Sequence, residues 1–137
     1  MTPVPFLSCM LVVAHLYALP PSALPAIRAV EGGAVGVVHH NRNGTDDLGP
    51  MQVNTFWIMP LARASGLSPV AVWSRLIGDP CFNVTAAGAI LRVYLDETHG
   101  NLMLAIGDYH SHTPVLNRLY QLKVVAAARR LFAAADR

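Results

Sequence analysis

The sequence predicts an all-α domain, with at most a small β element in one loop. Alanine, leucine and valine dominate the chain, whereas aromatic and charged residues are few; this composition favours close-packed helices over a sheet. Signals for helix starts, such as Ser-Pro and Thr-Pro pairs, recur along the chain, and no segment alternates convincingly with period two. A chain of 137 residues is long enough for one domain with one core.

The first apolar stretch, Phe6 to Leu19, admits two interpretations. An apolar run followed by small residues is typical of a signal peptide, but the basic leader is missing, since the first cationic residue is Arg28. Apolar residues also recur at helical spacing: Leu7, Met10, Leu11, Ala14 and Ala18. We therefore expect a first core helix, and no export signal is clearly visible in this sequence.

The second helix is predicted to start after Ser22, an N-cap residue, and to end at Gly32, which can take the left-handed conformation. Leu24, Ile27 and Glu31 lie at i, i+3 and i+7, so the carboxylate shares the apolar face. Partial burial and the negative end of the helix dipole are both expected to raise the pKa of Glu31, as general-acid chemistry requires. The alternative is a glutamate that only tethers the following loop.

The loop from Gly33 to Gly49 is polar, and a short hairpin is the one β element that it allows. The later helices are predicted from their caps and prolines; they run from Thr55 to Gly66, from Pro69 to Ile77, from Cys81 to Thr98, from Asn101 to His110, and onward from Pro114. In the helix from Cys81 we expect an inward stripe of Val84, Gly88, Leu91 and Leu95. In the last helix we expect Val115, Leu119, Leu122 and Ala126 to face inward.

Composition argues against several classes of function. The formal net charge of +2 and the scattered arginines give no basis for nucleic-acid binding. No run of eighteen apolar residues occurs, so we expect no transmembrane segment. We expect no metal and no cofactor, because neither Cys9 nor Cys81 has a partner at ligand spacing and the histidine pairs lack a third ligand. The two cysteines could pair or remain buried thiols.

Three polar clusters interrupt the apolar pattern: Glu31, the segment from Gly49 to Asn54, and the segment from Tyr109 to Ser111. If they converge, they combine one ionisable carboxyl with the amides of Gln52 and Asn54, the phenol of Tyr109 and the apolar side chain of Met51. Such groups suit a sugar polymer with N-acetyl groups. An ordinary glycosidase needs a second carboxylate, for which Asp46, Asp47 and Asp108 are the candidates.

The order of five motifs resembles lytic transglycosylases, and more narrowly the small members that accompany conjugation and secretion systems. The motifs are Glu31-Gly32-Gly33, Gly49-Pro50-Met51-Gln52-Val53-Asn54, Cys81-Phe82-Asn83-Val84, Ala105 to Tyr109, and His110-Ser111-His112-Thr113-Pro114. The resemblance covers about 9–125 and implies that 1–137 is one domain with the lysozyme-like fold of soluble lytic transglycosylases. It further implies a periplasmic enzyme whose partners are peptidoglycan glycan strands and subunits of a secretion or conjugation apparatus.

The resemblance assigns roles residue by residue. The family's catalytic glutamate falls on Glu31, and the motif that lines the subsite for an N-acetylated sugar falls on Gly49 to Gln52, so Gly49, Met51 and Gln52 are expected to bind substrate together with Asn54. The family's tyrosine near the glutamate falls on Tyr109. Cysteines at the positions of Cys9 and Cys81 imply a disulfide. Gly32 stands where serine is usual, and Pro50 where leucine is usual.

The mechanism implied by the resemblance needs one carboxyl, which protonates the glycosidic oxygen and then deprotonates the muramic C6 hydroxyl to leave a 1,6-anhydro sugar. Two alternatives stay open. A lysozyme-like hydrolase would use Asp46 or Asp47 as a second carboxylate. A non-catalytic peptidoglycan-binding module would have kept the groove and lost turnover through Gly32 and Pro50.

Overall fold

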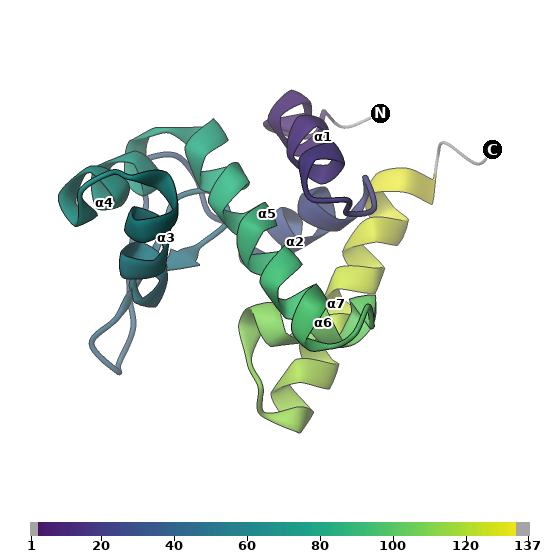
Figure 1. The fold of residues 1–137 in the computed structure, drawn as a ribbon. Helices are drawn as coiled ribbons and strands as arrows, with labels where there is room; N and C mark the ends of the chain where they lie inside the picture. The colour runs from purple at the N-terminus through teal and green to yellow at the C-terminus, as the bar shows by residue number, and fades with distance from the viewer. Residues whose placement is uncertain (1–2, 134–137) are drawn as a thin grey trace.

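The computed structural model describes residues 3–133, which form seven α-helices and a small sheet that lies on the same side of the molecule as α3 and α4 (Figure 1). The helices are α1 (Leu7–Leu16), α2 (Ala23–Glu31), α3 (Ile58–Ser65), α4 (Pro69–Gly78), α5 (Pro80–Glu97), α6 (Leu102–His110) and α7 (Pro114–Phe132). A 3-10 turn, η1 (Thr55–Trp57), precedes α3. The mainly helical prediction is confirmed, and the expected helix starts lie within a residue or two of the observed ones.

The sheet has three short antiparallel strands in the order β1 (Val38–His40), β2 (Asp46–Leu48) and β3 (Val53–Asn54). β1 and β2 form the hairpin that the sequence allowed. The two-residue β3 was not predicted, because it is too short to produce a pattern. Leu48 at the end of β2 pairs with Val53 at the start of β3, and both side chains are buried. The sheet therefore packs on the core at the end where the turn that begins at Gly49 connects β2 to β3.

α5 crosses the middle of the molecule, with α3, α4 and the sheet on one side and α6 and α7 on the other (Figure 1). Its predicted stripe of Val84, Gly88, Leu91 and Leu95 is buried, as expected. Gly88 lets α1 approach closely, because a Cβ there would overlap the side chain of Val13. α5 therefore holds both halves of the domain in one core.

The N-terminal stretch is part of this core, as predicted, since Met10 on α1 is fully buried. Its inward face differs from the expected one, however, because Val13 is buried while Leu11 and Ala18 are exposed; Ala18 lies beyond the end of the helix. None of the helices within residues 3–133 is long and apolar enough to cross a bilayer.

A disulfide joins Cys9 on α1 to Cys81 in the first turn of α5, with their Cα atoms 5.5 Å apart. This confirms the pairing that the family resemblance implied. The bond closes a loop with a sequence separation of 72 residues, which restricts the unfolded chain considerably.

The expected inward face of α7 is wrong. Val115, Leu119, Leu122 and Ala126 are exposed, and the buried residues are Asn117, Tyr120, Val124 and Ala127. The error has a physical reason: the inward positions near the start of the helix carry polar side chains that are hydrogen-bonded inside the fold, which a search for aliphatic periodicity overlooks. The aliphatic stripe instead faces outward.

Candidate active site

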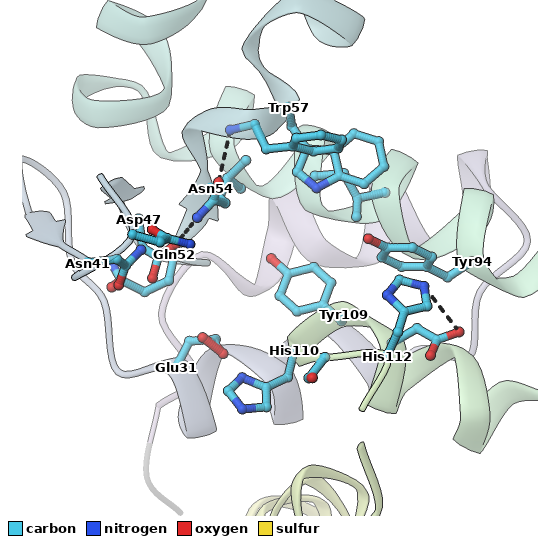
Figure 2. Close-up of a pocket in the computed structure, with 16 residues that line it drawn as sticks. Glu31, Asn41, Asp47, Gln52, Asn54, Trp57, Tyr94, Tyr109, His110 and His112 are labelled. Carbon is cyan, nitrogen blue, oxygen red and sulfur yellow. Dashed lines mark hydrogen bonds and ion pairs between the residues drawn. The ribbon is translucent and has the colours of Figure 1, made fainter. Parts of the chain in front are cut away.

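A cleft of about 380 Å³ lies between the sheet, η1, α5 and α6, and Glu31 stands at one end of it (Figure 2). Figure 2 places Tyr109 in the middle, with Glu31 and Asp47 on one side and Tyr94 and His112 on the other. The walls are rich in amide, carboxyl and aromatic groups. The three polar clusters found in the sequence therefore meet in one cleft.

Glu31 is the last residue of α2, and Leu24 and Ile27 on the same face are fully buried, as predicted. Gly32 ends the helix in the left-handed conformation, with a φ of 67°. Burial raises the pKa of the Glu31 carboxyl to about 7, and the negative charge of Asp47 adds to this. A hydrogen bond from Tyr120 and the positive charge of Lys123 act in the opposite direction. The predicted rise in pKa is confirmed, with burial as its main cause.

The residue that holds Glu31 is Tyr120 on α7, which the sequence analysis missed. Its hydroxyl donates a hydrogen bond of 3.0 Å to Oε2 of Glu31. Burial raises the pKa of Tyr120 far above its ordinary value, so its hydroxyl stays protonated and remains a donor. The ring of His110 stacks on that of Tyr120, with centroids 4.9 Å apart. The signal in the sequence was the spacing of Tyr120, which lies three positions after Asn117 and therefore on the same face of the helix.

Tyr109 lines the same cleft, but its hydroxyl donates to the carbonyl oxygen of Met51 at 2.8 Å. Burial is the main reason that the pKa of Tyr109 is raised well above its ordinary value. Tyr109 therefore ties α6 to the segment after β2, while the hydrogen bond to the glutamate comes from Tyr120.

The segment from Gly49 to Gln52 is a tight turn that only particular residues can form. Gly49 has a φ of 69°, and a Cβ there would overlap the Leu76 carbonyl oxygen and the Asn83 amide. Gln52 takes the left-handed conformation, with a φ of 52°, and its side-chain amide donates to the Gly49 carbonyl at 3.0 Å. Such a backbone outlier at a cleft is typical of functional sites.

The buried side chain of Asn83 anchors this turn. Its Oδ1 accepts the Met51 N–H at 2.8 Å, and its Nδ2 donates to the carbonyls of Leu48 and Leu76 at 2.8 and 2.9 Å. The N–H that anchors the turn belongs to Met51, so Pro50, which has none, does not remove this bond. The motif around Cys81 had pointed to this segment of α5 without indicating the role of Asn83.

Gln52, Asn54 and Tyr109 line the cleft beside Glu31, whereas Gly49 and Met51 do not. The Met51 side chain is 0% exposed and lies in the core. The apolar platform that the sequence suggested is therefore not provided by Met51 in this cleft; its main chain instead receives the hydrogen bond from Tyr109.

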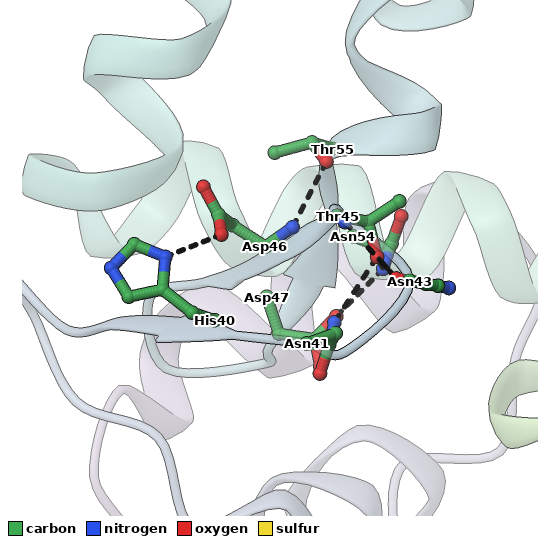
Figure 3. A network of polar contacts seen from close by, with 8 residues as sticks. All are labelled: His40, Asn41, Asn43, Thr45, Asp46, Asp47, Asn54 and Thr55. Atoms are coloured by element: carbon green, nitrogen blue, oxygen red, sulfur yellow. Dashed lines mark hydrogen bonds and ion pairs between the residues drawn. The ribbon is translucent and has the colours of Figure 1, made fainter.

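The three candidate carboxylates have different surroundings. Asp46 does not line the cleft; its Oδ1 lies 2.6 Å from Nδ1 of His40 on the hairpin (Figure 3). Asp47 lines the cleft, and its Oδ1 accepts a 2.9 Å hydrogen bond from the amide of Asn54. Asp108 also lines the cleft, and its carboxylate accepts from the Asn117 amide at 2.9 Å. Of the two aspartates in the hairpin, only Asp47 belongs to the site.

A network of small polar side chains shapes the hairpin tip (Figure 3). The hydroxyl of Thr45 accepts from the amides of Asn41 and Asn54 and donates to Asn43. Asn41 and Asn43 line the cleft together with Asn54. Asn54 also caps the next helical turn, because its Oδ1 accepts the Phe56 N–H.

Aromatic rings form the far part of the cleft. Trp57 and Tyr94 meet edge to face with centroids 5.8 Å apart, and Tyr94 meets His112 in the same way at 5.3 Å. Sequence reasoning missed Tyr94, because the periodic pattern of α5 indicated only its buried apolar stripe, to which Tyr94 does not belong. Within the described residues 3–133, no group of three His, Cys, Asp or Glu side chains is arranged to hold a metal ion.

The glycines after Glu31 have separate roles. Gly32 has open space around its Cα, but its positive φ favours glycine over serine. Gly33 is packed so closely against the turn that a Cβ would overlap the Gly49 carbonyl oxygen. Their sequence therefore fixes the distance between the end of α2 and the turn that carries Gln52.

A family model described as the transglycosylase SLT domain matches residues 8–121 of this chain. The invasion protein IagB of Salmonella typhimurium is 35% identical over 85 residues, which are 62% of this chain and 48% of that protein. Protein IpgF of Shigella flexneri is 33% identical over 108 residues, which are 78% of this chain and 67% of that protein. The match to IagB thus spans about half of that relative's length.

Proposed function

This chain belongs to the transglycosylase SLT domain family, and on that premise we propose that it is a lytic transglycosylase of peptidoglycan. It would cleave the β-1,4 bond between N-acetylmuramic acid and N-acetylglucosamine and leave a 1,6-anhydro end. The observation that carries the proposal is Glu31, a carboxyl with a pKa of about 7 at the end of a polar cleft.

The first step is proton donation. Near neutral pH a large fraction of Glu31 is protonated, and Tyr120 donates to Oε2. This leaves Oε1 as the oxygen free to carry the proton toward the glycosidic oxygen. As the C1–O bond breaks, the leaving sugar keeps the bonding electrons and the proton, and positive charge develops at the muramic C1. The acetamido group of the same sugar would stabilise that charge.

The second step returns Glu31 to its acid form. The carboxylate, now ionised, takes the proton from the muramic C6 hydroxyl as the oxygen attacks C1. The new C6–O–C1 bond closes the anhydro ring, and no water is consumed. The two steps thus balance with one carboxyl, which explains why a second carboxylate is not required. The hydrogen bond from Tyr120 stabilises the ionised form between the steps.

Substrate recognition is assigned to the remaining cleft residues. The side-chain amides of Gln52 and Asn54 are suited to hydroxyl and acetamido groups, and Trp57 and Tyr94 offer apolar surfaces for sugar rings. Tyr109 would fix the floor of the cleft. Gly49 and Met51 would contribute indirectly, by holding the turn that presents Gln52.

We place the protein in the periplasm or cell envelope, where it would open the wall locally for a secretion or conjugation apparatus. The Cys9–Cys81 disulfide supports an oxidising compartment. The role beside an apparatus rests on the resemblance to the small members that accompany such systems; the similar protein of Salmonella typhimurium bears the name invasion protein.

A hydrolase is the second candidate, because Asp47 lines the same cleft as Glu31. Asp47 would act as the base that activates water, and the product would have a reducing end. Its hydrogen bond with Asn54 and its effect on the pKa of Glu31 favour a supporting role instead. A binding module without turnover is the third outcome that the test must separate.

The experiment incubates purified sacculi with the oxidised wild-type protein, Glu31→Gln and Asp47→Asn, and identifies soluble muropeptides by mass spectrometry. We expect anhydro-muropeptides from wild type and Asp47→Asn, and a rate that is about a hundredfold to ten-thousandfold lower for Glu31→Gln. Reducing muropeptides that disappear with Asp47→Asn would establish the hydrolase. Retention on sacculi without any soluble product would establish the binding module.

A further inference from the structure

The outward face of α7 carries an aliphatic stripe. Val115, Leu119 and Leu122 are 68%, 51% and 62% exposed, and Ala126 continues the row. The spacing of i, i+4, i+7 and i+11 places all four residues on one side of the helix. Within residues 3–133 no other element covers this row, and α7 lies along one edge of the fold (Figure 1). Exposed rows of this kind mark interaction surfaces.

Cations border the stripe on both sides. Arg118 lies on one flank, Lys123 and Arg130 lie on the other, and Arg129 ends the row three residues after Ala126; all four are exposed. From Pro114 to Phe132 the helix contains no aspartate or glutamate. The surface therefore combines an apolar centre with a border on which Leu116 is also exposed and every charged residue is positive.

This combination specifies the occupant, and we infer that the outer face of α7 docks an acidic amphipathic helix of a different protein. The stripe follows the alternating spacing of four and three that forms the seam between two packed helices. When the stripe is treated as such a seam, the positions that flank it are those of Arg118, Lys123 and Arg130. Charges at flanking positions select the partner helix. Glutamates at the facing positions would pair with them.

The same charges exclude a second copy of this helix as the natural occupant, because arginine and lysine would then face arginine and lysine across the seam. A lipid surface fits less well. Helices that lie in a bilayer interface insert aromatic and large aliphatic side chains, whereas this stripe has no aromatic residue and only two leucines, the other two residues being the smaller Val115 and Ala126. Small residues in the row leave holes for the side chains of a facing helix.

The docking surface adjoins the site without occupying it. None of the four stripe residues lines the main cleft, so a docked helix and a glycan strand can be bound together. Leu119 and Lys123 also line a smaller cavity of about 220 Å³ that Glu31 and Tyr120 share. A partner on α7 would thus hold the enzyme with its main cleft free, beside the smaller cavity that Glu31 also lines.

The test uses two labelled synthetic helices with leucines in the seam, one with glutamates and the other with lysines at the flanking positions. Binding is followed by fluorescence anisotropy at low salt. Val115→Ser/Leu122→Ser removes the apolar centre, and Arg118→Glu/Arg130→Glu reverses the border. These positions are exposed and line neither cavity, and circular dichroism together with unchanged release of muropeptides from sacculi verifies that each variant is folded.

We expect wild type to bind the acidic helix at least about tenfold more tightly than the basic one, and Val115→Ser/Leu122→Ser to lose at least about tenfold in affinity. Arg118→Glu/Arg130→Glu should reverse the preference. Equal binding of both helices, or binding that neither variant changes, would overturn the inference. So would a wild-type dimer that Val115→Ser/Leu122→Ser dissociates, or binding to phosphatidylglycerol vesicles in the absence of helix binding.

Discussion

Replacing Glu31 with glutamine is expected to stabilise the folded protein at alkaline pH while removing its activity. The pKa of this carboxyl rises from its ordinary value of 4.5 to about 7 on folding, mainly because it is buried. Such a carboxyl favours the folded state fully below pH 4.5, and this contribution is lost as the pH rises through about 7. Glutamine carries no charge at any pH, and its side-chain oxygen can still accept the hydrogen bond from Tyr120.

The magnitude follows from the two pKa values. The difference between 4.5 and about 7 corresponds to about 3 kcal/mol of unfolding free energy. The unfolding free energy of Glu31→Gln relative to wild type should therefore increase by about 3 kcal/mol from about pH 4.5 to about pH 8.5. Most of this increase should be complete near neutral pH.

The assay is urea unfolding at both pH values, with the disulfide intact, for wild type, Glu31→Gln and Glu97→Gln. Glu97 is the only other glutamate in the chain and is exposed, so it serves as the matched control. Its substitution should change stability by at most about 0.5 kcal/mol at either pH. If the stability difference for Glu31→Gln is the same at both pH values, the carboxyl titrates normally and the account of its acidity is wrong.

Three further predictions follow from the contacts around the site. Tyr120→Phe removes the hydrogen bond that favours ionised Glu31, so the alkaline limb of the pH–rate profile on sacculi should move to higher pH and the rate should fall about tenfold. Asn83→Ala removes three buried hydrogen bonds, from the Met51 N–H and to the carbonyls of Leu48 and Leu76; urea unfolding should show a loss of about 2–4 kcal/mol. Cys9→Ser/Cys81→Ser should lower the unfolding free energy by about 4 kcal/mol, since it opens a long loop.

Each of these has its own comparison. Tyr17→Phe alters a tyrosine outside the cleft and should leave the pH–rate profile unchanged. Asn101→Ala removes an exposed helix cap and should cost about 1 kcal/mol; an equal loss for Asn83→Ala would show that its buried bonds contribute little. A serine double variant as stable as the oxidised wild type would contradict the role given to the disulfide.

The helices were predictable because their starts depend on local chemistry. Ser68 and Asn101 cap α4 and α6 with side-chain hydrogen bonds to residues three positions later, so the signal is contained in four consecutive residues. The buried setting of Glu31 was predictable for a similar reason, since this residue shares the apolar face of a short helix with Leu24 and Ile27.

What the sequence did not reveal depends on contacts between distant segments. Tyr120 lies 89 residues after Glu31, and no periodicity within α7 indicates a hydrogen bond across the fold. Asn83 joins the end of β2, the turn after it and α4 through three bonds that exist only after folding. The predicted inward face of α7 was wrong for the same reason. Asn117 and Tyr120 lie on the inward face because they form hydrogen bonds with other helices, whereas the periodic pattern assigned that face to aliphatic side chains.

The most direct test of the central claim follows the fate of water. Sacculi are digested by wild type in water labelled with heavy oxygen, and the new muramic ends are analysed by mass spectrometry. The account predicts anhydro ends without label, because the C6 oxygen of the sugar closes on C1 while Glu31 serves as acid and then as base. Reducing ends that carry one labelled oxygen for each cleavage would contradict it and would assign water activation to the cleft.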